Sequence, residues 1–214
     1  TTTEPGKITK LTRLDANLNQ NRADQVALLE KEQESNKLVR GEKPAKFKGL
    51  EQARFQQHDS LISELVADFN RHKEKYCGCD AAQAGNIPDL TSDLVKSWLI
   101  TESGGTPSAW AIDPAQVNVP LDWTPEKAAI GLTRPTRRNE GTPQLNIAAA
   151  LAYLCRKGFG RSGKAPRPDS KFDDWATALK RYNAATDPEG YAKNILDRVQ
   201  HPDRYVDPAY LRRR

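Results

Sequence analysis

Leu94 to Gly105 reads LVKSWLITESGG, and this stretch decides the fold. Leu94, Trp98 and Glu102 recur every four residues, so they share one face of a helix that Ser-Gly-Gly ends. A carboxylate on such a face, at a helix C-terminus, is badly solvated, and burial and the helix dipole both favour its protonated form. Glu102 is therefore a candidate general acid, although a helix-end glutamate with its head group in water fits the same local pattern.

Further apolar patterns predict helices on both sides of this one. We expect them over 50–76, over 143–157, over 172–183, and along the last pattern, Tyr191–Val199. No alternation of strands and helices is visible, which predicts a mainly α class with at most a small β element.

Two boundary features complete the expected fold. Thr91 or Ser92 is expected to cap the Glu102 helix. Residues 103–143 are rich in proline and irregular, with a short strand expected at Ala115–Val119. A long connection of this kind is often functional, and because it follows Glu102 directly it could form the wall of a cleft.

Composition separates two regions. Residues 1–49 are polar, with sparse apolar positions, and are interpreted as a polar helical arm or linker; residues 50–214 form the expected domain. No run approaches the roughly 18 apolar residues that a membrane span needs, and no secretory signal is visible. The net charge of +5 suits a polyanionic partner such as nucleic acid or cell wall, but a solubilising surface charge explains it equally well.

The cysteines and histidines do not predict a metal site. Cys77 and Cys79 lack the second pair that a zinc ribbon requires, and the three histidines are dispersed. One of these two cysteines could form a disulfide with Cys155 in an oxidising compartment, or all three could be reduced and buried. We expect neither metal nor cofactor.

Three blocks, in this order, resemble the superfamily of soluble lytic transglycosylases and goose-type lysozymes. They are Glu102-Ser103-Gly104, the helix from Asn146 to Leu154 (NIAAALAYL), and Ala178 to Ala184 (ALKRYNA). The resemblance implies a lysozyme-like α+β domain over roughly residues 90–200. It also implies cleavage of the β-1,4 bond between N-acetylmuramic acid and N-acetylglucosamine, with Glu102 as the acid.

Departures from the family pattern affect the middle of the match. The family's Gly-Leu-Met-Gln segment aligns either with Gly131–Arg134 or, at a better distance from Glu102, with Asp113–Val117. We prefer the second alignment, which makes residues 118–142 an insertion. Alanines at positions 150 and 185 replace glycines of the family pattern.

A hydrolase usually needs a second carboxylate, and Asp113 and Asp122 are the candidates. Each has an ordinary alternative role, Asp113 as a turn initiator and Asp122 as a loop acid. A lytic transglycosylase needs neither, because the 6-hydroxyl of the substrate's muramic acid attacks instead.

The resemblance also implies a set of substrate-binding side chains. These are Ser103, Gln116, Tyr153, Tyr182 and Asn183. Tyr182 fits a core position equally well, and Asn183 a helix cap.

The expected partner is the glycan strand of peptidoglycan, with an immunity protein or a secretion apparatus as further possibilities. The domain is expected to be secreted or delivered to the periplasm, as in an antibacterial effector. The basic stretch Arg156–Arg167 is predicted to be a flexible loop that could bind wall carboxylates or phosphate. A catalytically inactive wall-binding module is the main alternative; a nucleic-acid binder ranks lower, because no helix carries a readable basic motif.

Overall fold

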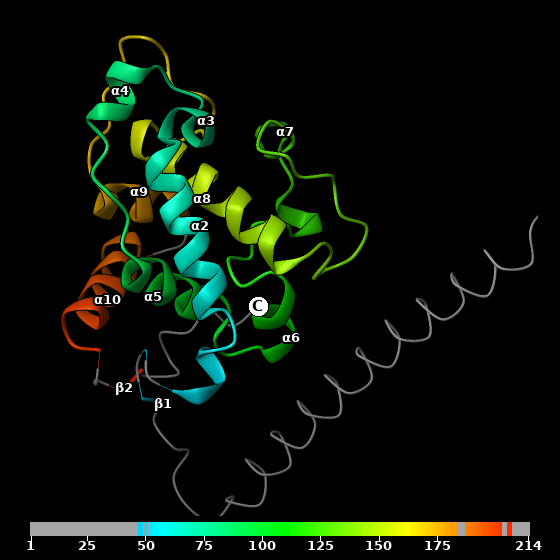
Figure 1. Ribbon diagram of the computed structural model, residues 1–214. Coiled ribbons are helices and arrows are strands. Elements are labelled where there is room, and N and C mark those ends of the chain that lie inside the picture. Colours follow the sequence, from blue (N-terminus) through cyan, green and yellow to red (C-terminus); the bar gives the residue numbers. More distant parts are fainter. Residues whose placement is uncertain (1–46, 49, 51, 184–186, 203–204, 207–214) are drawn as a thin grey trace, which may run out of the picture. The chain divides into compact units, whose positions relative to one another are not determined.

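The computed structural model describes residues 47–48, 50, 52–183, 187–202 and 205–206, which form a mainly helical fold (Figure 1). This confirms the predicted class. Apart from β1, the arm predicted over residues 1–49 lies outside the described residues. The elements follow in the order β1 (Phe47–Lys48), η1 (Ala53–Phe55), α2 (Asp59–Arg71), α3 (Lys73–Cys77), α4 (Ala81–Gly85), α5 (Ser92–Ser103), α6 (Pro107–Ile112), η2 (Pro120–Asp122), α7 (Pro125–Ala128), α8 (Pro143–Phe159), α9 (Trp175–Tyr182), α10 (Pro188–Gln200) and β2 (Tyr205–Val206).

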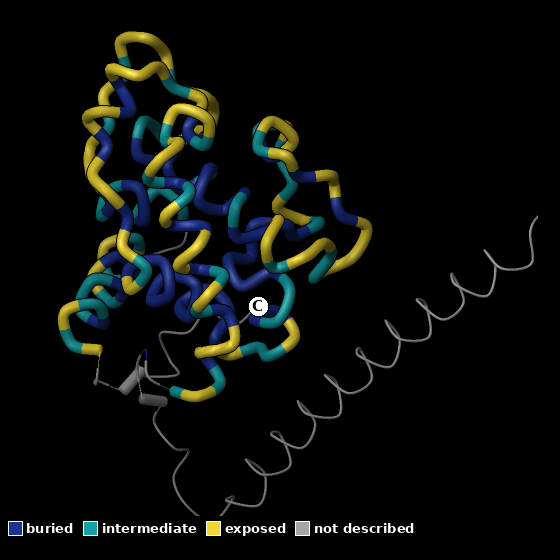
Figure 2. The backbone as a smooth tube through the Cα atoms, in the orientation of Figure 1, coloured by how far each residue is buried: buried dark blue, intermediate teal, exposed yellow. Residues whose placement is uncertain are grey.

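Helix α5 is the buried centre of the fold. Every residue from Leu94 to Ser103 is buried, and the helix packs against α2 and α10 (Figures 1 and 2). The side chain of Thr91 caps it by accepting a hydrogen bond from the Leu94 N–H at 3.2 Å, which settles the two predicted alternatives. Within the described part of the chain, the sheet is the two-residue antiparallel pair β1–β2, in which Phe47 pairs with Val206 and Lys48 with Tyr205.

Helix α8 is the second buried helix, and it packs against α9, α3 and α2. Thr142 caps its first turn, and the helix continues to Phe159, two residues beyond the predicted end. Arg156 and Lys157 are therefore buried parts of a helix, so the prediction of a flexible loop starting at Arg156 is wrong at its first residues.

The predicted single helix over 50–76 is instead three pieces: η1, α2 and α3. The chain leaves helical geometry at His72, with φ −130° and ψ 43°. There the His72 N–H donates to the carbonyls of both Asp68 and Phe69, and the ring Nδ1 lies 3.0 Å from the Asp68 carboxylate. This break turns α3 away from α2 and lets it pack on α8.

A disulfide joins α3 to α8 through Cys77 and Cys155, whose Cα atoms are 5.4 Å apart. Cys79 is a half-buried free thiol, and burial raises its pKa. Of the alternatives left open by the sequence, the structure therefore has the bridge with one thiol remaining.

The strand predicted at Ala115–Val119 is absent. Residues 113–119 have no regular secondary structure, yet all seven are buried. Backbone groups in a buried irregular segment need partners from elsewhere in the chain. Those partners define the candidate site.

Candidate functional site

Glu102 lies in the last turn of α5 and is 1% exposed. The alternative in which its head group lies in water is therefore wrong. The hydroxyl of Tyr191, on α10, donates a hydrogen bond to Glu102 Oε1. A carboxyl held in a buried position by a hydroxyl donor is fixed in orientation, as a group that transfers a proton must be.

A polar contact between α10 and α5 keeps this pair in place. The buried Arg198 guanidinium donates to the Ser97 carbonyl at 2.6 Å and to the Thr101 hydroxyl oxygen at 2.9 Å. Burial lowers the Arg198 pKa to about 10. Because Arg198 lies two helical turns from Tyr191 on α10, these bonds fix how far along α5 the Tyr191 side chain lies, which places it beside Glu102.

The buried segment 113–119 is organised by Asp113. Its carboxylate accepts the backbone N–H of Val117 at 3.1 Å and of Asn118 at 2.9 Å. Gln116 has φ 52°, an uncommon value for a residue with a side chain, and its Nε2 donates to the Asp113 carbonyl at 2.8 Å. Asp113 therefore closes a tight turn, as its turn-initiating interpretation predicted.

Three side chains from the family-like blocks hold this segment. Ser103 Oγ donates to the Pro114 carbonyl at 2.8 Å, and the Tyr182 hydroxyl donates to the Ala115 carbonyl at 2.9 Å. Asn146 Nδ2 donates to the Ile112 carbonyl, also at 2.9 Å. The blocks near residues 102, 146 and 182, far apart in sequence, thus meet around one loop.

An aromatic cluster includes Trp98, which lies one helical turn before Glu102 on α5. Tyr182 packs edge-on against Trp98 and against Tyr153, with ring centroids 4.8 and 5.8 Å apart. The pKa of Tyr182 is raised well above its usual value, first by burial and then by the negative charges of Glu102, Asp113 and Asp122. The negative charges of the three predicted carboxylates therefore all act on this phenol.

Two lysines border the same cluster. Lys157 Nζ lies 4.9 Å from the Tyr153 ring centroid and Lys127 Nζ lies 5.7 Å from it. Lys127, 2% exposed, also pairs with Asp122, whose carboxylate is 3.2 Å away and 60% exposed. Asp122 thus lies at the solvent-exposed edge of the cluster. Positive charge beside half-buried aromatic rings suits an anionic or sugar-bearing ligand.

The structure therefore gathers most of the predicted site. The residues that meet are Glu102, Ser103, Asp113, Gln116, Tyr153 and Tyr182. Asn183 is buried and takes the C-cap position of α9, the alternative considered from sequence. Tyr191 and Lys127 could not be picked out from the sequence, because the first fits an apolar helical pattern and the second an exposed-looking polar turn.

Asp113 gives a testable pH dependence of stability. Burial, aided by the Glu102 charge, raises its pKa from 3.8 to about 6 despite the two backbone hydrogen bonds. The folded protein then binds this proton more tightly than the unfolded chain. The resulting stability is fully present below pH 4 and is lost as the pH rises through about 6.

As the pH rises from 4 to 7, we expect the free energy of unfolding of wild type to fall by roughly 2–3 kcal/mol more than that of Asp113→Asn, because one pKa unit corresponds to about 1.4 kcal/mol. Urea unfolding at each pH measures this difference. The exposed Asp89→Asn serves as a control and should follow wild type. Parallel pH curves for wild type and Asp113→Asn would show that Asp113 titrates normally.

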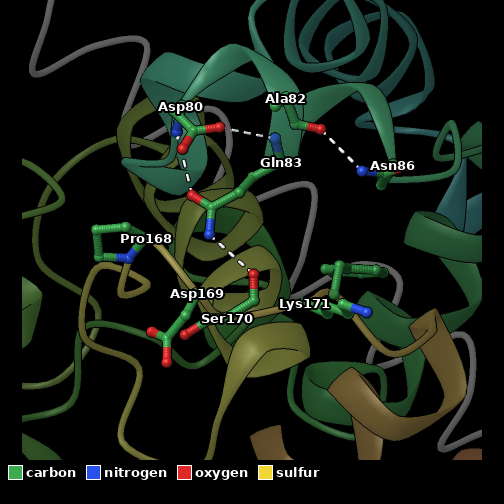
Figure 3. Close-up of a pocket in the computed structure, with 9 residues that line it drawn as sticks. Asp80, Ala82, Gln83, Asn86, Pro168, Asp169, Ser170 and Lys171 are labelled. Carbon is green, nitrogen blue, oxygen red and sulfur yellow. Dashed lines mark hydrogen bonds between the residues drawn. The ribbon is translucent and has the colours of Figure 1, made fainter.

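A polar pocket of about 580 Å³ lies away from this cluster, between α4 and the segment 168–172 (Figure 3). Gln83 and Asp80 form a capping box at the start of α4. Gln83 Nε2 also donates to the carbonyls of Arg167 and Ser170 at 2.8 and 2.9 Å. These bonds attach the connection between α8 and α9 to α4, so we assign the pocket's amide a structural role.

Among the described residues, no group of three or more His, Cys, Asp or Glu side chains is arranged to hold a metal ion. No helix in the described part of the chain is long and apolar enough to cross a membrane. No family model, curated protein or solved structure matches this chain.

Proposed function

We propose that this protein is a peptidoglycan-cleaving glycosidase with a lysozyme-like domain, and that Glu102 is its general acid. The observation that carries the proposal is the buried Glu102 carboxyl, hydrogen-bonded by Tyr191 at the end of the central helix. Breaking a glycosidic bond requires an acid that protonates the leaving oxygen. The convergence of the three family-like blocks around the buried loop that follows α6 supports the same assignment.

Substrate must reach a group that is 1% exposed. The half-buried rings of Tyr153 and Tyr182 pack edge-on against each other, and Lys157 lies over the Tyr153 ring. A glycan strand therefore has to displace neighbouring side chains when it binds, and sugar faces can then stack on these rings. Water is excluded from the acid until that moment, which suits proton transfer to a sugar oxygen.

The contacts of Asp113 and Asp122, the two candidates for a second catalytic carboxylate, favour one of the two reaction types. Asp113 already accepts two backbone N–H groups, and Asp122 is paired with Lys127. A nucleophile or base would have to give up these bonds. We therefore favour the lytic transglycosylase reaction over the muramidase reaction. In it, Glu102 gives its proton to the leaving oxygen, and its carboxylate then takes the proton of the muramic acid 6-hydroxyl as that oxygen attacks the sugar.

Two other functions rank lower. A wall-binding module without activity would have no need of a buried carboxyl, which is costly to desolvate. A nucleic-acid binder would need clustered basic side chains on one face, whereas Lys127 and Lys157 are buried beside carboxylates and an aromatic ring.

The Cys77–Cys155 disulfide supports a secreted or periplasmic location, because such bonds persist in oxidising compartments. The proposed partner is the glycan strand. An immunity protein or a secretion apparatus would be additional partners of such an effector.

The deciding experiment is incubation with purified peptidoglycan, followed by mass spectrometry of the soluble fragments. We expect fragments ending in 1,6-anhydro-muramic acid, which identify the transglycosylase. Reducing muramic ends would identify a muramidase instead. Co-sedimentation without fragments would contradict the enzymatic proposal and favour the binding module.

A further inference from the structure

A groove of about 300 Å³ lies between α3, the residues after α7, and α8. Its floor is made of small apolar side chains from α8, Ala148, Ala149 and Ala152. Tyr76 also lines the groove. Its hydroxyl already donates to the Asp68 carboxylate at 2.8 Å, so the ring is the part of this side chain left for a ligand. The space suits a ligand of a few alanine-sized units.

A buried cation lines this groove. Arg156 is 6% exposed, and no carboxylate among the described residues lies within ion-pair distance of its guanidinium. Nη2 donates to the Ala129 carbonyl at 3.2 Å, whereas the buried Nε has no hydrogen-bond partner. A buried guanidinium without a counter-ion is expensive, and an anion bound in the groove beside the accessible edge of Arg156 would offset its charge.

The end of α3 packs directly against the Arg156 guanidinium. Gly78 ends that helix with φ 68°, and a side chain there would come within 3.2 Å of Arg156 Nη2. The adjacent Cys77–Cys155 bond holds α3 on α8. Lys75, exposed on the same wall, adds a second positive charge, and no acidic side chain lines the groove.

We propose that this groove binds the C-terminal carboxylate of a short peptide with alanine-sized side chains. Arg156 and Lys75 receive the carboxylate, and the alanine floor receives the methyl groups. The alanine floor matches side chains of that size, and an uncharged ligand would leave Arg156 without its counter-ion.

This site is separate from the Glu102 cluster. Leu145, Ala149, Ala152 and Arg156 follow at spacings of four, three and four, so they form one stripe of α8. Asn146 and Tyr153, seven residues apart, form another stripe, which contacts the Glu102 side. The proposed peptide binding therefore does not depend on cleavage by Glu102.

The test is calorimetric titration of the full chain with N-acetyl-trialanine, compared with the same peptide as its C-terminal amide. We expect saturable binding of the acid and about 10- to 100-fold weaker binding of the amide, because hydrogen bonds to charged groups are the strong ones. In NMR spectra, the amide signals of 73–77 and 145–156 should shift, while those of 113–118 should not.

Three variants complete the test. Arg156→Met should weaken binding by about 10- to 100-fold, Lys75→Gln by about 2- to 5-fold, and Ala148→Phe, which fills the groove, should abolish it. Ala148 and Lys75 reach the surface, so their variants report on the groove even if Arg156→Met does not fold. Equal affinity for acid and amide, binding unchanged by Ala148→Phe, or no binding at millimolar peptide would each overturn the proposal.

Discussion

Replacing Glu102 by Gln is expected to reduce the release of fragments from peptidoglycan by about 10²- to 10⁴-fold, the usual contribution of a general acid. Gln has the shape of Glu and can still accept the Tyr191 hydrogen bond through its amide oxygen. It has no proton to give to a leaving sugar oxygen. The loss should therefore fall on kcat, with the thermal midpoint and binding to insoluble wall material close to those of wild type.

Glu64→Gln is the matched control, since Glu64 is an exposed glutamate on α2, and it should retain full activity. Equal turnover by wild type and Glu102→Gln would remove Glu102 from the reaction and leave the lysozyme-like proposal without its acid. A variant that neither cleaves nor binds wall material would instead indicate a damaged fold, which the thermal midpoint reports directly.

The main helices could be predicted because their evidence is local. The spacing of Leu94 and Trp98, the cap at Thr91 and the alanine-rich run in α8 each lie within one element. The break at His72 could not be predicted in this way. The break allows α3 to pack on α8. That contact joins Cys77 to Cys155, 78 residues away in the sequence, so no local pattern contains it.

The buried loop was mispredicted for a related physical reason. Alternating apolar residues at Ala115, Val117 and Val119 look like a strand, and all three are indeed buried. The backbone partners are not another strand, however, but the side chains of Ser103 and Tyr182 and the Asp113 carboxylate. Such partners come from the tertiary fold, which periodicity does not contain.

The grouping of residues in the candidate site was partly predictable from the order and spacing of the family-like blocks. Glu102 and Tyr182 belong to blocks that the family resemblance picks out, and the structure brings them together. Tyr191 has no such signal. Its spacing with Ile195 is that of any buried helix face, and only the fold shows that its hydroxyl is donated to Glu102.

Removing the disulfide is the change with the largest expected effect on stability. The bond links residues 78 positions apart, and loop-closure entropy for that length corresponds to roughly 4 kcal/mol. Cys77→Ala/Cys155→Ala should therefore lower the thermal midpoint by about 10 °C for a chain of this size. Differential scanning calorimetry of the variant and of wild type, each with and without reductant, measures the effect.

Cys79→Ala is the matched control, because it removes a half-buried thiol and leaves the bridge intact. Its stability should lie within about 0.5 kcal/mol of wild type. Reductant should lower the midpoint of wild type and of this control, but not that of the double variant. If all three proteins melt together in oxidising buffer, the bridge contributes nothing to stability.

Because the bond holds α3 against α8, its loss should also open the Arg156 groove and weaken peptide binding there while leaving Glu102, on α5, in place.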